Sequence, residues 1–242
     1  MSQSKMLWRK SASERLDLTP LDRSLSVDLV VIGGGFTGTA AALEAARRGA
    51  RVCLLEADVI GHGGSGRNVG LVNAGLWLPP ETVIDQMGEA AGRRLIEMLS
   101  DGPRRVFAII EHEGIACEAV RAGTLHLAAS RSGLRDLEER HRQGVALGAP
   151  LALLDARETA RRTGTPEYHG GLLDPRAGTI QPLAYCRGLA RAAIARGALI
   201  HERSPVRSVV RADGSWRAEG DLFCVKAKSL LLATNAYQLG LG

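Results

Sequence analysis

The sequence lacks a long hydrophobic run. None of its apolar stretches approaches the roughly 18–20 residues that a membrane-spanning helix needs. Residues 1–17 are partly basic but have no apolar core, so they do not predict a secretory signal. Glu14 and Asp17 also argue against a mitochondrial transit peptide, because such peptides are poor in acidic residues. We therefore expect a protein without a membrane span.

Cysteine is scarce as well. The sequence has four, and they lie far apart: Cys53, Cys117, Cys186 and Cys224. None forms a C-x-x-C pair, and no histidine stands at metal-binding distance in the sequence, so the pattern predicts neither a disulfide framework nor a metal site. We expect reduced, mostly buried thiols in a cytoplasmic protein, and no thiol-based catalysis.

Aromatic residues make up only 4% of the chain, and its 31 basic residues are almost all arginine. The net charge of +5 raises the question of nucleic-acid binding. However, the arginines are scattered in pairs such as Arg47-Arg48 and Arg161-Arg162, within or at the ends of expected helices and close to acids. Few side chains could stack on bases. The charge therefore predicts solvated helical faces, with no nucleic-acid partner.

Among the features that are present, the most informative is a strand–helix–strand pattern near the N-terminus. Residues 28–32 form a β-branched run typical of a strand buried on both faces, and residues 51–56 form a second one. Between them, residues 37–48 are alanine-rich and are followed by Gly49, which favours a helix with a glycine stop. The pattern predicts a parallel βαβ unit and an α/β fold.

The rest of the chain predicts further elements. Residues 1–25 predict an extended arm, and a helical pattern runs from about Glu81 to Gly114 with a break near Gly102-Pro103. Asp155 and Glu158 predict a capped helix start, and Pro182 predicts the first turn of another helix. Residues 116–120 and 124–129 alternate like a hairpin, and Asp213-Gly214 predicts a hairpin turn between 206–211 and 216–219.

The turn after the first strand carries the glycine pattern of dinucleotide-binding folds, reading Gly33-Gly34-Gly35-Phe36-Thr37-Gly38. Gly33 permits a tight turn, Gly35 lets the backbone approach a pyrophosphate, and Gly38 lets the helix pack against the sheet. The helix N-terminus then offers free N–H groups to the phosphates. Alone the pattern is weak, because a loop that merely needs glycine also fits it, but here strand and helix surround it.

Glu56 ends the second strand, where a carboxylate can accept both hydroxyls of a ribose. Its negative charge, with that of Asp58, disfavours the 2′-phosphate of NADP. Strand, helix, third glycine and terminal acid together predict dinucleotide binding, but they leave FAD and NAD both open.

The following segment, IGHGGSGRNVG over residues 60–70, favours FAD. We call it the cofactor loop, and its residues 65–68 the SGRN loop. Its glycines allow a close approach to a flat ligand, Ser65 and Asn68 can supply hydrogen bonds, and Arg67 can meet a phosphate or an anionic ring. The alternative is a flexible surface loop. A hydrolase elbow is excluded, since Arg67 stands where G-x-S-x-G requires its last glycine.

DLVVIGGGFTGTAAALEAARRGARVCLLEA followed by IGHGGSGRNVG resembles the D-amino-acid oxidase-like family of FAD-dependent oxidoreductases, and within it the gamma-glutamylputrescine oxidase-like branch. Residues 170–182, 198–206 and 231–237 are also similar to segments of that family, so the likeness covers about residues 26–240.

The resemblance implies a Rossmann-type, glutathione reductase-like FAD-binding domain with an inserted, incomplete β-rich substrate domain. We expect an N-terminal arm over 1–25, the first part of the FAD-binding domain over 26–115, a substrate-domain segment over 116–178 and the second part of the FAD-binding domain over 179–242.

The resemblance also assigns cofactor contacts at matching positions. The glycine turn would hold the pyrophosphate, and Glu56 would bind the adenosine ribose. The SGRN loop would run along the cofactor toward the flavin. Val206 would contact adenine, and Ala233-Thr234 would lie beside the nucleotide. The complete set of predicted cofactor residues is Gly33, Gly34, Gly35, Phe36, Thr37, Gly38, Glu56, Ser65, Arg67, Asn68, Val206, Ala233 and Thr234.

In function, the resemblance implies oxidation of a C–N bond in an amine or amino acid, by hydride transfer to the flavin. No catalytic residue can be named from the sequence. His62 lies in the loop of residues 60–70, near its SGRN segment, where a packing or phosphate role is the simpler interpretation. His126 and His169 are substrate-side candidates by position alone.

The sequence departs from the family at its end, because members continue well past the ATNAY motif whereas eight residues follow Thr234 here. We expect either a fragment or a chain that needs a second polypeptide for the missing C-terminal half. A flavin-binding subunit without activity of its own is the alternative function. An NAD-dependent dehydrogenase is disfavoured by the SGRN loop.

Overall fold

The computed structural model describes residues 6–237, and within them the chain divides into two compact units. The first comprises the chain up to Val69, Ile110–Cys117 and the chain from Gln181 onward. The second comprises Gly70–Ile109 and Glu118–Ile180. These boundaries differ from the expected ones, since the helical segment after Gly70 groups with the inserted segment.

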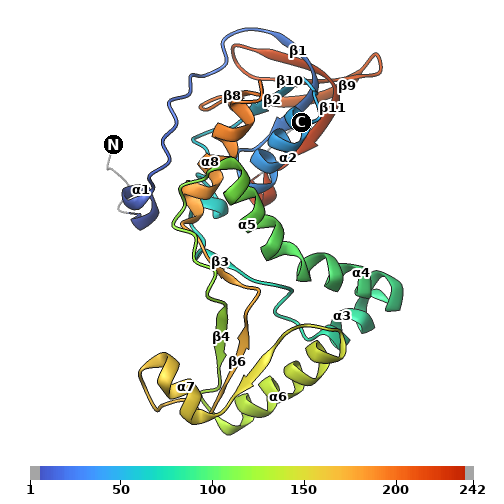
Figure 1. Cartoon of the computed structure of the whole chain (residues 1–242). Helices are drawn as coiled ribbons and strands as arrows, with labels where there is room; N and C mark the ends of the chain where they lie inside the picture. Colours follow the sequence, from blue (N-terminus) through green and yellow to red (C-terminus); the bar gives the residue numbers. More distant parts are fainter. Residues whose placement is uncertain (1–5, 238–242) are drawn as a thin grey trace. The chain divides into compact units, whose positions relative to one another are not determined.

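The first unit is built on a six-stranded sheet in the order β8-β2-β1-β11-β10-β9 (Figure 1). The strands β1, β2, β8 and β11 run parallel, and β10 and β9 extend the sheet as an antiparallel hairpin. Their bounds are β1 Leu25–Ile32, β2 Val52–Leu55, β8 Leu199–His201, β9 Ser208–Ala212, β10 Ser215–Glu219 and β11 Cys224–Leu232. All four residues of β2 are buried, as the predicted apolar run requires.

Two helices of the first unit pack on one another, α2 (Phe36–Arg47) and α8 (Pro182–Ile194). Helix α8 is buried along most of its length, which its alanines and Gly188 permit. Its N-terminus has a proline in the first turn and a side-chain cap, because Gln181 accepts the N–H of Ala184 at 2.7 Å. The predicted helix beginning at Pro182 is thereby confirmed.

The N-terminal arm is attached to the first unit by specific contacts. It contains a short helix, α1 (Leu7–Ser11), and buries Ala12 and Leu21. The carboxylate of Glu14 is 9% exposed and makes two bonds, 3.0 and 3.1 Å long, with Arg191 of α8. The extended arm that the sequence predicts is therefore a packed element with one helical turn.

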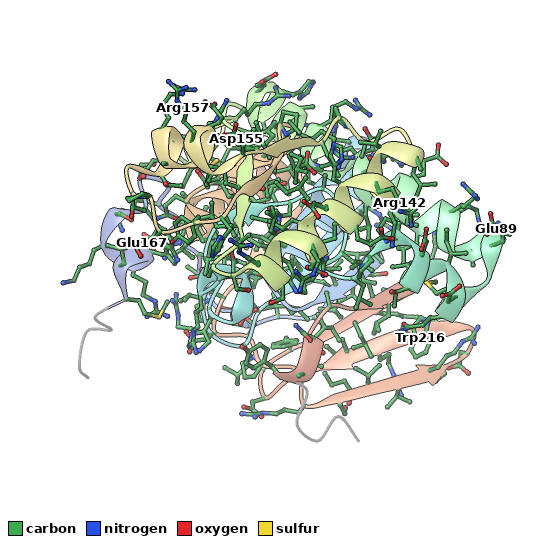
Figure 2. The ribbon with its side chains drawn as sticks, turned by 90° about the horizontal axis from the view of Figure 1, so that it is seen from below. Glu89, Arg142, Asp155, Arg157, Glu167 and Trp216 are labelled. Carbon is green, nitrogen blue, oxygen red and sulfur yellow. The ribbon has the colours of Figure 1, made fainter. Side chains whose placement is uncertain are left out.

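The second unit contains α3, α4, the first part of α5, α6 and α7, a three-stranded antiparallel sheet in the order β4-β6-β5, and a two-stranded pair, β3 with β7. Figure 2 labels Asp155 at the start of α7, where its side chain accepts the N–H of Glu158 at 2.7 Å. This confirms the predicted cap. The bounds are β3 Leu71–Val72, α3 Pro80–Met87, α4 Glu89–Ser100, α5 Gly102–Glu113, β4 Thr124–Leu127, α6 Arg131–Ala146, β5 Ala152–Leu154, α7 Ala156–Thr163, β6 Gly171–Asp174 and β7 Gly178–Thr179.

One expected hairpin is wrong. Residues 116–120 and 124–129 alternate like a local hairpin, but 124–127 pairs with 171–174, and Val120 bridges to Thr179. The error has a physical reason, since alternation reports one-sided burial and does not name the partner strand. By contrast, the hairpin over Asp213-Gly214 is confirmed, and both turn residues have the positive φ, 51° and 69°, that such a turn needs.

Candidate cofactor site

The glycine turn follows β1 and packs against the end of β11. Gly33 has a φ of +109°, and a Cβ there would lie 2.6 Å from the carbonyl oxygen of Ala233. A Cβ on Gly38 would lie 1.9 Å from the carbonyl oxygen of Gly33, so α2 can approach the strand end only because this position has no side chain. Both roles expected for these glycines match the geometry.

The middle of the turn is held by side chains from two other segments. The N–H of Gly34 donates to Glu56 Oε2 at 2.6 Å, and the N–H of Phe36 donates to Ser65 Oγ at 2.9 Å. A Cβ on Gly35 would reach Ser65 Oγ at 2.8 Å. The end of β2 and the SGRN loop therefore both meet the turn.

The N-terminus of α2 lies at this turn. Its N-cap is Gly35, which has no side chain to accept a hydrogen bond, and the first helical turn contains no acidic residue. The backbone N–H groups of a helix N-terminus and the positive end of its dipole favour an anion. A side chain on Gly35 would collide with the hydroxyl of Ser65, so this position must be glycine for the loop to reach the helix N-terminus.

Glu56 follows β2 and uses both carboxylate oxygens on backbone N–H groups. Oε2 accepts from Gly34, and Oε1 accepts from Asp58 at 2.9 Å. Each oxygen retains a further lone pair that could accept a hydroxyl. The carboxylate is thus held in place by the backbone, with acceptor capacity left for a further hydrogen bond.

The SGRN loop begins as a short 3-10 turn, η1 (Gly64–Gly66), after Gly61. It is closed by Asn68, whose Nδ2 donates to the carbonyl oxygens of Gly64 at 3.2 Å and Ser65 at 2.9 Å. Gly66 has no room for a side chain, because its Cβ would lie 2.1 Å from the carbonyl oxygen of Gly61. Arg67 is exposed. The alternative of a flexible surface loop does not fit this hydrogen-bonded turn.

The remaining predicted contacts come from β11 and from the segment after β8. Ala233 donates its N–H to the carbonyl oxygen of Ile32 at 2.8 Å, which places Ala233-Thr234 beside the glycine turn. Ser204 donates its N–H to the carbonyl oxygen of Glu56 at 2.8 Å, so the chain leading to Val206 passes the end of β2. Val206 is half-buried against the core below the sheet.

Two residues of α8 support the turn, and sequence reasoning missed them. The thiol of Cys186 is buried and donates to the carbonyl oxygen of Gly34 at 3.4 Å; burial raises its pKa to about 12. The ring of Tyr185 meets that of Phe36 edge-on, with centroids 5.5 Å apart, and burial raises the pKa of its hydroxyl to about 12. The only sequence signal for this close packing is that α8 has many small residues.

A buried acid, Glu202, was also missed. It is 5% exposed, and its Oε1 accepts the N–H of Ile60 at 2.8 Å, which anchors the start of the cofactor loop. Burial raises the pKa of this carboxyl, and the nearby Glu56 raises it further. A lone glutamate after a short strand gives no sequence signal for this role.

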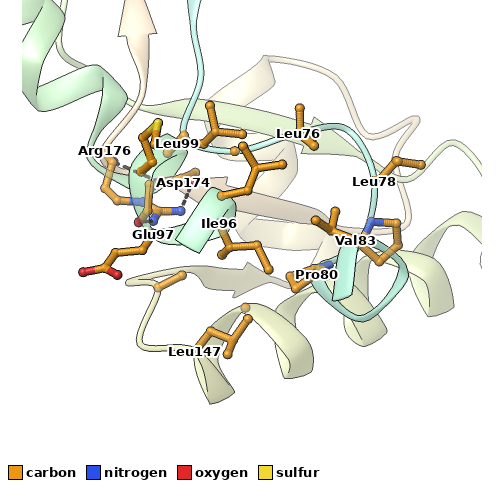
Figure 3. A pocket seen from close by; sticks show the side chains of 18 of the residues that line it. Leu76, Leu78, Pro80, Val83, Ile96, Glu97, Leu99, Leu147, Asp174 and Arg176 are labelled. Carbon is orange, nitrogen blue, oxygen red and sulfur yellow. Dashed lines mark hydrogen bonds and ion pairs between the residues drawn. The ribbon is translucent and has the colours of Figure 1, made fainter. Parts of the chain in front are cut away.

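The second unit contains an open cavity of about 1010 Å³ (Figure 3). Its wall is largely apolar, with Leu76, Val83 and Ile96, and it also includes Arg176, which forms an ion pair with Asp174 at 2.6 Å. His126 lines the cavity too, whereas His169 does not. Burial lowers the pKa of His126, and the positive charge of Arg140 lowers it further.

Nearly the whole chain, both units included, matches a known family. The model of the FAD dependent oxidoreductase family, DAO, matches residues 28–242. The chain belongs to the DAO family. Members of this family depend on FAD, which confirms FAD over NAD, and the α/β Rossmann-type fold is confirmed with it. The helix N-terminus behind a glycine turn and the carboxylate of Glu56 are groups with the chemistry to hold such a cofactor.

Several DAO-family relatives are similar to this chain. It is 33% identical over 229 residues to a probable oxidoreductase OrdL of Haemophilus influenzae, covering 94% of this chain and 53% of that protein. It is 33% identical over 230 residues to the gamma-glutamylputrescine oxidoreductase of Escherichia coli, covering 94% and 53%. The crystal structure of glycine oxidase from Geobacillus kaustophilus has the same fold, with a TM-score of 0.74 and 22% identity over 88% of this chain and 56% of that one.

The chain spans about half the length of these DAO-family relatives. Within the part that the structure describes, no helix is long and apolar enough to cross a membrane, and no group of three or more potential ligands is placed to hold a metal ion.

Proposed function

We propose that the chain is the FAD-binding, N-terminal portion of an oxidoreductase that oxidises a C–N bond of an amine or amino acid. The observation that supports the proposal is that residues from three other segments contact one glycine turn. Glu56 holds the N–H of Gly34, Ser65 holds that of Phe36, and Ala233 lies against Gly33. The similarity to gamma-glutamylputrescine oxidoreductase supports an amine substrate.

The proposal gives each predicted cofactor residue a role in binding FAD. Residues 33–38 bind the pyrophosphate through backbone N–H groups, and Glu56 accepts the hydroxyls of the adenosine ribose. Ser65, Arg67 and Asn68 line the cofactor toward the flavin. Val206 contacts adenine, and Ala233 with Thr234 closes over the nucleotide. FAD supplies the hydride acceptor, and the chain's part is to bind and orient it.

We propose further that the second unit is part of the substrate domain, and that the active site is completed by residues equivalent to the C-terminal half of the relatives, supplied by more of the same protein or by a second polypeptide. The coverage of about half of each relative supports this proposal. Hydride transfer requires the flavin and the substrate to be held at near-attack distance, which one half of such a site does not provide. The alternative is a flavin-binding subunit without activity of its own.

The cofactor is tested directly. The purified chain, denatured after gel filtration, should release FAD, identified by its absorbance and chromatography. The Glu56→Ala variant should bind FAD more weakly by roughly 1–3 kcal/mol, the scale for loss of a hydrogen bond to a charged group. Glu56→Gln should lose less, because one acceptor oxygen remains. Stoichiometric NAD, or unchanged FAD affinity in both variants, would contradict the proposal.

The dependence on a second half is tested by complementation. The 242-residue chain should not bleach its flavin when mixed anaerobically with a panel of small amines. Addition of the C-terminal half of a full-length relative, in cis or in trans, should restore flavin reduction. Rapid reduction by the chain alone would exclude the need for a partner.

We also propose a cytoplasmic location. None of the four cysteines, all of which lie in the described part of the chain, forms a disulfide, and three of them are buried, which suits a reducing compartment. Fractionation of cells that express the chain tests this point.

A further inference from the structure

His62 lies within the cofactor loop and contacts charged groups through both of its ring nitrogens. Nδ1 is 3.1 Å from Asp58 Oδ1, and Nε2 is 3.1 Å from Nη2 of Arg67. A third charged group, Arg9 of α1, places its Nη2 3.3 Å from Nδ1. These three side chains are the charged groups that the structure records at the imidazole.

The chemistry of these partners determines the tautomer of His62. A guanidinium can only donate and a carboxylate can only accept. Nε2 must therefore carry the lone pair that accepts from Arg67, and Nδ1 must carry the hydrogen that is donated to Asp58. If Nδ1 accepted from Arg9 instead, neither nitrogen would carry a hydrogen, which a neutral imidazole does not allow. The arrangement with Asp58 satisfies two of the three contacts.

We propose that His62 is a positioning residue that orients Arg67 in the cofactor loop, with Asp58 fixing the tautomer that makes this orientation possible. The proposal rests on the proposed function, in which Arg67 contacts the cofactor. It assigns a role to the imidazole that a packing or phosphate contact would not have.

The same chain of hydrogen bonds reaches the ribose acid. The N–H of Asp58 donates to Glu56 Oε1 at 2.9 Å, and Oε2 of Glu56 accepts from Gly34. Five groups are thus linked from the glycine turn to Arg67: Gly34, Glu56, Asp58, His62 and Arg67. The two ends of the proposed cofactor site, adenosine and SGRN loop, are therefore held by one network.

The physical benefit lies in the conformational freedom of Arg67. An exposed arginine side chain samples many rotamers, and binding a ligand requires it to lose that freedom. An acceptor at Nε2 holds the guanidinium in one orientation before the cofactor arrives, so less entropy is lost on binding. His62 affects the cofactor through Arg67 and needs no contact with it.

Two matched variants separate the two nitrogens. In His62→Gln, the amide oxygen can take the place of Nε2 and accept from Arg67, whereas the contact with Asp58 is lost. In His62→Asn, the shorter amide can take the place of Nδ1 and donate to Asp58, whereas the contact with Arg67 is lost. We expect FAD affinity, measured by flavin fluorescence quenching, to fall roughly three- to tenfold in His62→Asn and less in His62→Gln.

A double-mutant cycle distinguishes positioning from a structural role. If His62 acts through Arg67, then His62→Asn should have little further effect on FAD affinity in a chain that already carries Arg67→Ala. A structural role of His62 would give additive losses, and additive losses would overturn the proposal. So would an equal loss of affinity in the Asn and Gln variants.

A third measurement needs no cofactor. The nitrogen-15 NMR spectrum of the cofactor-free chain, labelled at histidine and recorded at about pH 8 where imidazole is neutral, reports the tautomer directly. We expect His62 to be protonated at Nδ1, and its Nε2 resonance to move in Arg67→Ala. A hydrogen on Nε2 would exclude the proposal whatever FAD does. If the wild-type chain takes up no FAD, the proposed function fails, and this spectrum still decides whether His62 orients Arg67.

Discussion

The hydroxyl of Ser65 accepts the backbone N–H of Phe36 at 2.9 Å, and so the cofactor loop caps the helix that follows the glycine turn. The helix needs this cap from outside, because its own N-cap residue is Gly35. A side chain distant in sequence thereby couples the loop to the proposed phosphate site.

Replacement of Ser65 by alanine should therefore destabilise the fold as well as the cofactor site. Loss of a side-chain cap costs about 1 kcal/mol, so thermal unfolding should occur at a lower temperature and FAD should bind more weakly. Ser132→Ala is the control, because that hydroxyl is exposed on α6 and bonds only to Ser130 among its described partners. Equal melting temperatures for the two variants would contradict the capping role.

A methyl group at Gly38 should be far more damaging than one at Gly102. The first would meet the carbonyl oxygen of Gly33, a backbone atom that cannot turn aside, and we expect Gly38→Ala to lose about 1–3 kcal/mol of unfolding free energy together with FAD binding. Gly102 begins α5 and has nothing within 4 Å of its Cβ position, so Gly102→Ala should be neutral or slightly stabilising. Urea unfolding of both variants measures the difference.

The stability of the folded chain should depend on pH through the ionisation of Glu202. Burial raises the pKa of this carboxyl in the folded chain, so folding takes up a proton there. Its contribution to stability is then complete below the ordinary pKa of glutamate and is lost as the pH rises through the folded-state value. The melting temperature of Glu202→Gln relative to the wild type should accordingly increase from about pH 4 to about pH 8. The opposite trend would show that the folded chain favours the charged carboxylate.

Thiol reactivity should separate the four cysteines. Burial raises the pKa of Cys53 and of Cys186 to about 12, so almost no thiolate forms at either site while the chain is folded. Cys224 is only half-buried and should react first with Ellman's reagent. In Cys224→Ser the rapid phase should disappear and return only in urea. A rapid phase that survives this change would mean that one of the buried thiols is accessible.

The parts of the structure that could be predicted from sequence are those whose signal is local. The βαβ unit agrees closely, with strands predicted at 28–32 and 51–56 and found at 25–32 and 52–55. Its glycines, cap signals and apolar runs act within a few residues of one another. The local sequence pattern is therefore enough to predict where these strands and the helix lie.

The contacts that could not be predicted join segments far apart in sequence. Cys186 on Gly34, Glu202 on Ile60 and Val120 on Thr179 all depend on which elements pack together. No periodicity encodes such a choice, since each residue alone fits a buried position in many folds. The break at Gly88, where φ is +78°, was also missed within the long helical pattern after Glu81.

The central strand pair has a consequence for how the protein comes to fold. Val30 of β1 pairs with Leu230 of β11, so the two central strands of the sheet come from near opposite ends of the described chain. During synthesis, one edge of β1 stays without its neighbour until β11, 200 residues further along the chain, has left the ribosome. Pairings of such long sequence separation slow folding and leave a strand edge open to other chains in the meantime. We therefore expect the yield of folded protein to depend on chaperones that cover this edge.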